Sequence, residues 1–168
     1  MEFNSKLNNK NLFINDMKYN FNDYYWMKKA IILAKRAQQN GEIPVGALLI
    51  NDKKIIATGW NANILLHDPS AHAEILVLRT AGRQLKNYRL LNTTIYVTLE
   101  PCIMCAGALI NARINRLVYG AYNPNIGAAG STINIFNKYY NNHKINITGG
   151  VLAKKCSNML NNFFKKKR

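Results

Sequence analysis

The sequence has few acidic residues, few cysteines and no long hydrophobic run, and each scarcity excludes something. No apolar stretch approaches the ~18 residues of a membrane-spanning helix, so no membrane role is expected. Residues 1–22 contain neither a continuous apolar segment nor an arginine, which fits neither a secretory signal nor a mitochondrial presequence. Three cysteines, two of them in one C-x-x-C pair, argue against a disulfide framework. We therefore expect a cytoplasmic protein whose thiols stay reduced.

The shortage of acidic residues leaves a strongly basic chain. Lys and Arg number 23 against 8 for Asp and Glu, which gives a formal charge of +15. Because phosphate neutralisation dominates nucleic-acid affinity, this balance favours a polyanionic partner. The alternative is compositional drift, since Lys, Asn, Ile and Tyr are all abundant, as A/T-rich coding would produce. Charge alone does not identify which nucleic acid is bound.

At 168 residues and 48% hydrophobic content, the chain is long enough for one domain and too short for two comfortable ones. Residues 1–18 have the composition of a polar N-terminal extension, and residues 19–168 are expected to form the domain. Periodicity and turn residues predict the following elements. Helices are expected over 22–40, from 69 or 70 to 81, from 100–102 to 111 and over 151–164, and strands over 44–50, 54–59, 94–99, 116–121 and 144–148, with a loop over 122–131 and a short helical piece after it. This order predicts an α/β sandwich of about five strands with helices on both faces.

Two short segments carry the residues with chemical potential. His72-Ala73-Glu74 supplies an imidazole and a carboxylate, and the Pro101–Cys105 segment supplies the two thiols of Cys102 and Cys105. One imidazole and two thiolates form a three-ligand set, which is typical of catalytic zinc with an open fourth position, whereas structural zinc has four ligands. The H-x-E…P-C-x-x-C pattern matches the signature of zinc-dependent nucleobase deaminases, in which the Glu is not a ligand.

The spacing of these residues explains how they could share one ion. Cys102 and Cys105 are three apart at a helix start, so both sulfurs lie on one face, and the helix N-terminus favours thiolates. His72 is expected in the first turn of another helix, and two helix starts at one sheet edge can face each other. Soft thiolates with an imidazole suit zinc. Glu74 could then accept a proton from water and pass it to the base and the leaving ammonia.

A closed structural zinc site is the alternative to a catalytic one. It would need a fourth ligand, for which Cys156, His67 and His143 are the candidates. Cys156 falls on the apolar face of the last predicted helix, where a buried free thiol is ordinary. A closed site would also leave Glu74 beside the metal without a task.

The likeness to one family extends well beyond the metal motif. The chain resembles the bacterial tRNA-specific adenosine deaminases, within the cytidine-deaminase-like fold, over about residues 22–164. The segments that carry the resemblance are 43–47 (IPVGA), 59–61 (GWN), 67–74 (HDPSAHAE), 87–90 (NYRL), 96–108 (YVTLEPCIMCAGA), 127–131 (GAAGS) and Phe163-Phe164. The resemblance implies a three-layer α/β/α sandwich and a homodimer with one Zn²⁺ per subunit. It also implies conversion of the wobble adenosine of an arginine tRNA anticodon to inosine, with no DNA substrate expected.

The resemblance also implies roles for residues around the base. Asn61 would hydrogen-bond the nucleoside, the Ala73 backbone N–H would hold the base, and Val45 and Leu99 would line the pocket. A turn position after Trp60 is the alternative role for Asn61. The base would be splayed out of the anticodon loop, because an enzyme cannot reach C6 in a stacked base.

The C-terminal residues are candidates for RNA contact. Phe164 beside the basic tail, residues 165–168, has the composition of a stacking surface with phosphate anchors. A core position is the alternative for Phe164, although Phe163 fits that role better. The tail lysines could equally serve only solubility. Arg113 and Arg116 are weaker phosphate candidates, for which a solvated face is the simpler interpretation.

One position departs from the family pattern. Relatives often carry an acidic residue where this chain has Asn123. An aspartate can accept a hydrogen bond from a ribose 2′-hydroxyl, whereas Asn accepts one without the negative charge. The change either relaxes the selection of RNA over DNA or is neutral.

Two other functions remain open from the sequence. The metal motif also fits a free-base or nucleoside deaminase acting on guanine, cytosine or cytidine, because the same machinery attacks C4 of cytosine or C6 of adenine. A non-catalytic, zinc-stabilised RNA-binding domain is the non-enzyme alternative. The basic charge and Phe164 favour tRNA over a small molecule.

Overall fold

The computed structural model describes residues 21–137 and 143–167, so the expected extension over residues 1–18 lies outside the described residues. Its elements follow in the order α2 (Phe21–Gln39), β1 (Gly46–Asn51), β2 (Lys54–Trp60), α3 (Ala73–Leu85), β3 (Thr94–Leu99), α4 (Ile103–Asn111), β4 (Arg116–Ala121), β5 (Asn146–Thr148) and α5 (Ala153–Lys166). No helix in this part of the chain is both long enough and apolar enough to cross a membrane.

The strands form one mixed sheet in the order β2-β1-β3-β4-β5. The β1–β2 pair is an antiparallel hairpin, and its turn residues Asp52 and Lys53 both have positive φ, as the tight primed turns require. Strand β3 pairs antiparallel with β1 and parallel with β4, and β4 pairs parallel with β5. The central position of β3 explains its run of buried β-formers, Ile95, Tyr96 and Val97.

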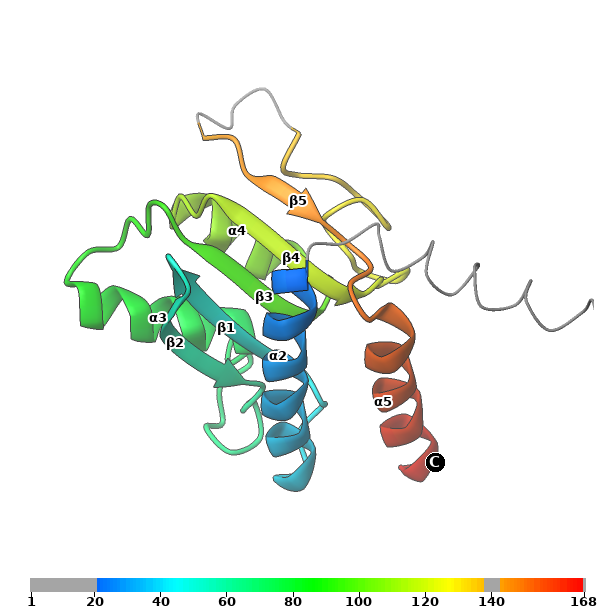
Figure 1. The fold of residues 1–168 in the computed structure, drawn as a ribbon. Helices are drawn as coiled ribbons and strands as arrows, with labels where there is room; N and C mark the ends of the chain where they lie inside the picture. Colours follow the sequence, from blue (N-terminus) through cyan, green and yellow to red (C-terminus); the bar gives the residue numbers. More distant parts are fainter. Residues whose placement is uncertain (1–20, 138–142, 168) are drawn as a thin grey trace, which may run out of the picture.

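Helices cover both faces of the sheet, which confirms the expected three-layer α/β/α sandwich (Figure 1). One core cluster joins α3 and α4 to one face through residues such as Leu49, Val97 and Leu117. The other joins α2 and α5 to the opposite face through Leu48, Tyr96 and Val118. Alternate residues of each strand therefore serve opposite layers, as the pleat requires.

Helix α2 packs very close to β1. Its buried face holds Met27, Ala30 and Ala34, all completely buried. A Cβ atom on Gly46 would lie 2.4 Å from both the Ala30 carbonyl oxygen and the Ala34 nitrogen, so only glycine fits there. This close approach fixes the start of β1, and with it the position of Val45 just before the strand.

Several element boundaries differ from the sequence predictions, most of them by one or two residues. Helix α3 starts at Ala73 and not at Pro69 or Ser70, because the backbone N–H and the hydroxyl of Ser70 both donate to Asp68 Oδ1 and hold a turn there. It also continues past Ala81 to Leu85. The short helical piece expected after residue 131 is absent from residues 132–137, where Asn134 forms a β-bridge with Ala129 instead.

Candidate active site and metal centre

Two helix N-termini meet at the carboxyl end of β3. His72 is the N-cap residue of α3 and Cys102 is the N-cap residue of α4, each with extended backbone dihedrals. His72 was expected inside the first helical turn; it lies one step before it because the turn at Asp68 delays the helix. Cys105 follows Cys102 by one turn of α4 and is completely buried. The crossover from β3 to α4 and the start of α3 thus bring three metal-ligating side chains together.

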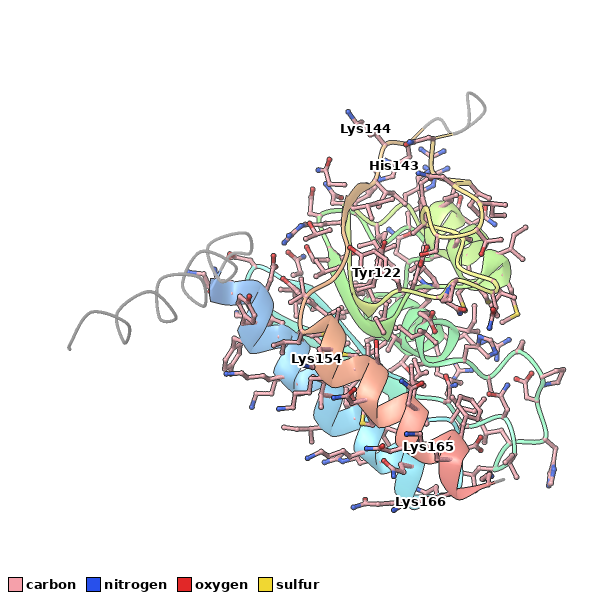
Figure 2. The ribbon with its side chains drawn as sticks, turned by 90° about the vertical axis from the view of Figure 1, so that its right-hand side faces the viewer. Tyr122, His143, Lys144, Lys154, Lys165 and Lys166 are labelled. Carbon is pink, nitrogen blue, oxygen red and sulfur yellow. The ribbon has the colours of Figure 1, made fainter. Side chains whose placement is uncertain are left out.

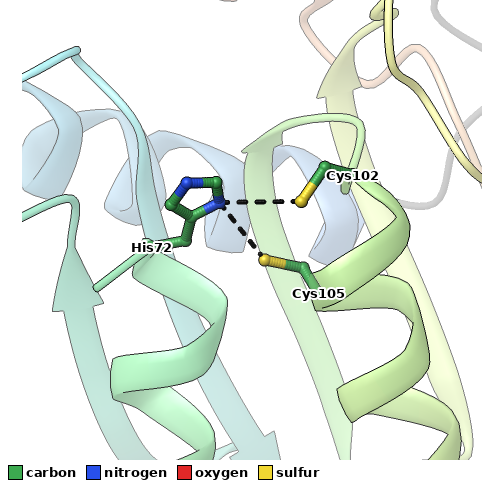
Figure 3. Close-up of side chains that lie close together, drawn as sticks. All are labelled: His72, Cys102 and Cys105. Carbon is green, nitrogen blue, oxygen red and sulfur yellow. Dashed lines mark hydrogen bonds between the residues drawn. The ribbon is translucent and has the colours of Figure 1, made fainter. Parts of the chain in front are cut away.

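The three ligand atoms are close enough to share one ion (Figure 3). His72 Nδ1 lies 3.7 Å from Cys102 Sγ and 3.4 Å from Cys105 Sγ, and all three ligand atoms lie within 4.8 Å of one another. Tetrahedral zinc with ordinary Zn–S and Zn–N bond lengths separates such nitrogen and sulfur atoms by about 3.6 Å. The donor set and its spacing therefore fit zinc.

The pKa values of the two thiols are shifted in opposite directions. Hydrogen bonds from Cys105 and from His72 lower the pKa of Cys102 to about 4, against the cost of burial. The pKa of Cys105 is raised, because its proton is held by the Cys102 sulfur and its own site is buried. The hydrogen bond to Cys102 raises the pKa of His72. The lowered pKa of Cys102 favours its thiolate, which is the form that binds metals.

Glu74 lies in the first turn of α3, beside the three ligands, and its side chain is 4% exposed. Burial raises the pKa of Glu74 to about 7, so the carboxyl group can both accept and donate a proton near neutral pH. This group is not part of the metal-ligating cluster.

Among the described residues, no fourth ligand completes the cluster. Its members are His72, Cys102 and Cys105. Cys156 is buried in the opposite layer, where a Cβ added to Gly120 would lie 2.5 Å from its sulfur. His143 places its Nε2 atom 2.7 Å from the Ile114 carbonyl oxygen. The closed site considered above therefore lacks its candidate ligands.

A cavity of about 540 Å³ opens directly onto the metal-ligating residues. His72, Glu74 and Cys102 lie at its wall. Five of the six residues predicted to contact substrate also line it: Val45, Asn61, Leu99, Asn123 and Phe164. The structure thus gathers residues from five different parts of the chain around one space. Ala73, the sixth, does not line the cavity and is completely buried.

Asn61 and Ala73 contact each other. The Ala73 backbone N–H donates to Asn61 Oδ1 over 2.9 Å in a buried hydrogen bond. In this structure the N–H that was predicted to hold the base orients the Asn61 amide, and its contact with a base stays a prediction. Because the bond uses Oδ1, the NH₂ group is the polar end of Asn61 that a ligand could meet.

The C-terminal end of α5 forms one side of the same cavity. Phe163 is 7% exposed and Phe164 is 46% exposed, so Phe163 has the core position and Phe164 the accessible one. The two rings meet edge to face, 5.5 Å apart. Lys167 Nζ lies 4.9 Å from the centre of the Phe163 ring and donates to the Gly41 carbonyl oxygen, which closes α5 against the end of α2.

Glu100 has a role that the sequence did not reveal. Its side chain is 1% exposed and accepts hydrogen bonds from three backbone N–H groups, those of Asn123, Ala129 and Ser131, each 3.0 Å long. The Ser131 hydroxyl also donates to it. One buried carboxylate therefore holds the loop that carries Asn123 against the end of β3. Glu42 similarly accepts from the Ile64 and Leu65 N–H groups at the other rim of the cavity.

A shared signal could have identified both glutamates. The described chain has six acidic residues, and four of them, Asp23, Glu42, Glu74 and Glu100, are buried. Acids are so few in this basic chain that each is a candidate for a specific structural role. A carboxylate that is buried needs partners, because an unpaired one is expensive.

The prediction for Arg116 is wrong. The residue was expected on a solvated face or as a weak phosphate contact, but its guanidinium forms two hydrogen bonds of 2.8 and 2.7 Å to the buried carboxylate of Asp23. It also donates to the Thr148 hydroxyl. The pair ties α2 to β4, with the Asp23 carboxylate buried and the Arg116 side chain partly exposed. Arg113, in contrast, occupies a positive-φ position after Ala112, the C-cap residue of α4.

Comparison with known proteins finds relatives over most of the chain. The model of the MafB19-like deaminase family matches residues 21–168. A tRNA-specific adenosine deaminase of Haemophilus influenzae is 52% identical over 147 residues, which cover 87% of this chain and 85% of the relative. The tRNA-specific adenosine deaminase of Bacillus subtilis is 41% identical, over 87% and 91% of the two chains.

Solved structures are similar as well. A tRNA:A34 deaminase, from a study of A-to-I editing at the wobble position of tRNA, has a TM-score of 0.78 and 39% identity, over 81% of this chain and 99% of that one. A guanine deaminase from Nitrosomonas europaea shares the fold with a TM-score of 0.73 at 24% identity, over 83% of each chain.

Proposed function

This chain belongs to the family of the tRNA-specific adenosine deaminases, and we propose that it converts adenosine in tRNA to inosine by hydrolysis. Adenosine and water are consumed, and inosine and ammonia are formed as the bond from C6 to the amino group is replaced by a bond from C6 to oxygen. The proposed target is the wobble adenosine, position 34, of an arginine tRNA anticodon. The observation that carries the proposal is a three-ligand cluster with a buried carboxyl group beside it, both at the wall of one cavity.

His72, Cys102 and Cys105 would hold one zinc ion per subunit. Their spacing fits tetrahedral zinc, and the described chain offers no fourth ligand to close the site. When bound, zinc supplies a Lewis acid that makes a water molecule nucleophilic near neutral pH.

Glu74 would move the protons. Its carboxylate would accept one proton from water and deliver it to the ring nitrogen next to C6. It would then accept a second proton from the hydroxyl group added at C6 and give it to the departing amine, which leaves as ammonia. A pKa of about 7 suits a group that must act first as base and then as acid.

The cavity walls would bind the base. Val45 and Leu99 offer apolar surface to the ring, and the Asn61 amide offers a hydrogen bond to the nucleoside. Ala73 would support this contact by orienting Asn61. The half-exposed ring of Phe164 would stack on a nucleotide next to the splayed adenosine, and Asn123 would lie near the ribose.

The partners proposed are the tRNA anticodon stem-loop and a second copy of the chain in a homodimer. The formal charge of +15 supports a nucleic-acid substrate. A cytoplasmic location stays a prediction.

A free-base deaminase is the second candidate, because the guanine deaminase has the same fold. Its low identity supports the fold only. A deaminase of free bases has no need of a strongly basic surface or of an exposed aromatic ring at the cavity mouth.

The test is to incubate the purified protein with arginine tRNA and, separately, with adenosine, guanine, cytosine and cytidine, and to measure inosine and ammonia. We expect inosine in the tRNA and no turnover of the small molecules. Turnover of guanine or cytidine alone would favour the second candidate. Binding of tRNA without any deamination would favour a zinc-stabilised RNA-binding domain.

A further inference from the structure

A second hollow lies between α2 and α5. Figure 2 shows the two helices side by side on the face that carries Lys165 and Lys166. Its volume is about 490 Å³. Helix α2 lines it with Ile31 and Lys35, one helical turn apart, and α5 lines it with Lys155, Met159, Lys165 and Lys166. The floor is apolar and the rims are cationic. We call this feature the α2–α5 groove.

The groove is cationic without compensation. Helix α5 contains no acidic residue, and the only acid of α2, Asp23, is paired with Arg116. The two ion pairs found among the described residues, Arg79–Asp68 and Arg116–Asp23, involve none of the four groove lysines. Holding four positive charges along one hollow has an electrostatic cost that an anionic occupant would remove.

The groove and the catalytic cavity share one helix. Lys165 and Lys166 line the groove, whereas Phe163, Phe164 and Lys167 line the cavity. The hydrogen bond from Lys167 to Gly41 joins the ends of α5 and α2 between the two spaces. A chain that leaves the cavity across Phe164 therefore reaches the cationic end of the groove within one helical turn.

We propose that the α2–α5 groove binds the phosphate backbone of the RNA strand that flanks the target adenosine, an inference that rests on the proposed function. Lys155 and Lys165 are ten residues apart on α5, about 15 Å, which is the rise of about four stacked nucleotides. Lysine contacts to phosphate carry no sequence information, so the groove adds affinity and register while the cavity selects the base.

The test compares two variants that lose equal charge. One replaces Lys35, Lys155, Lys165 and Lys166 with Gln; the matched control replaces Lys53, Lys54, Arg83 and Lys86 with Gln. The control side chains are exposed and lie at the β1–β2 turn and the end of α3, on elements that do not line the groove. Thermal unfolding of both variants checks that each is folded.

The readout is the salt dependence of binding to an anticodon stem-loop. Each lost phosphate contact lowers the magnitude of the slope of log K against log[salt] by about 0.7–0.9. The four substitutions of the groove variant should therefore lower it by about 3, and those of the control by much less. The kcat/KM of the groove variant should fall for the stem-loop but not for an oligonucleotide limited to the target and its two neighbours.

Three results would overturn the inference: equal slopes in both variants, an equal loss on the short oligonucleotide, or unchanged RNA binding with an altered oligomeric state. A wild-type protein that makes no inosine in tRNA would instead refute the proposed function. The two failures are thus distinguishable.

Discussion

Glu74 is the residue whose chemistry can be separated most cleanly from its structural role. The Glu74→Gln change keeps the size of the side chain and removes its ability to carry a proton. We expect deamination of tRNA to fall by at least about 100-fold, as for loss of a general acid/base. Zinc content and tRNA affinity should stay unchanged, measured by metal analysis and filter binding. Retained activity would remove Glu74 from the mechanism.

Cys156 offers a contrast to the two metal-site thiols. Burial raises the pKa of the Cys156 thiol to about 11, from 9.0. The folded state thus keeps this thiol protonated where the unfolded state would ionise it, so its stabilising contribution is complete below about pH 9 and is lost as the pH rises through 11.

The native, metal-loaded protein should therefore resist alkylation by iodoacetamide at pH 8, and mass spectrometry should find Cys156 modified only after denaturation. Modification of the folded protein at Cys156 would contradict its burial.

A substitution at Asn123 tests how the protein selects RNA over DNA. The Asn123→Asp change introduces a negative charge near the position proposed for the ribose. We expect the ratio of deamination rates on matched RNA and DNA hairpins to rise, because the carboxylate accepts a stronger hydrogen bond from the 2′-hydroxyl. Equal ratios for both forms would show that Asn123 is neutral for this selection.

At the scale of the elements, Glu100 connects the end of β3 to the loop over residues 122–131. The Glu100→Gln change places an NH₂ group against backbone donors, so at least one buried N–H loses its acceptor. We expect a loss of about 1–3 kcal/mol in unfolding free energy, measured with urea.

Because the same loop carries Asn123, the KM for the stem-loop should rise more than kcat falls. Asp52→Asn is the matched control, since it makes the same chemical change at an exposed turn position that tolerates Asn. Equal destabilisation by both changes would refute the role assigned to Glu100.

The elements themselves were largely predictable from sequence, and the reasons are local. Strand β3 follows from consecutive β-formers, and the β1–β2 hairpin from its turn residues. The start of α3 was missed because Pro69 and Ser70 look like a helix N-terminus, whereas Asp68 captures Ser70 first. The contacts of Glu100 and of the Asp23–Arg116 pair join residues 23 to 93 positions apart, and no periodicity reports them.

The candidate site divides in the same way. Its ligand types and Glu74 could be identified because the chemistry restricts both residue type and spacing. The contact between Asn61 and Ala73 could not, since it depends on how β2 and α3 meet in space.

At the scale of the whole molecule, the few acidic residues determine how the charge is distributed. Four of the six described acids are buried, which leaves Asp52 and Asp68 to balance the cationic surface, and Asp68 is paired with Arg79. The outside of the described domain is therefore even more uniformly positive than the composition suggests. This arrangement attracts RNA from a distance, and its effect on association should weaken steeply with salt.

The pairing of two helix N-termini also has a consequence for folding. His72 belongs to the half of the chain that forms β1, β2 and α3, and the two cysteines belong to the β3–α4–β4 half. An ion held by all three would act as a cross-link that closes a loop of 30 residues between His72 and Cys102. Ligand binding to the native state alone raises stability by mass action. Chelation should therefore lower the melting temperature, and zinc should restore it in wild type but not in His72→Ala. The metal would then stabilise the contact between the two halves of the domain, in addition to any catalytic role.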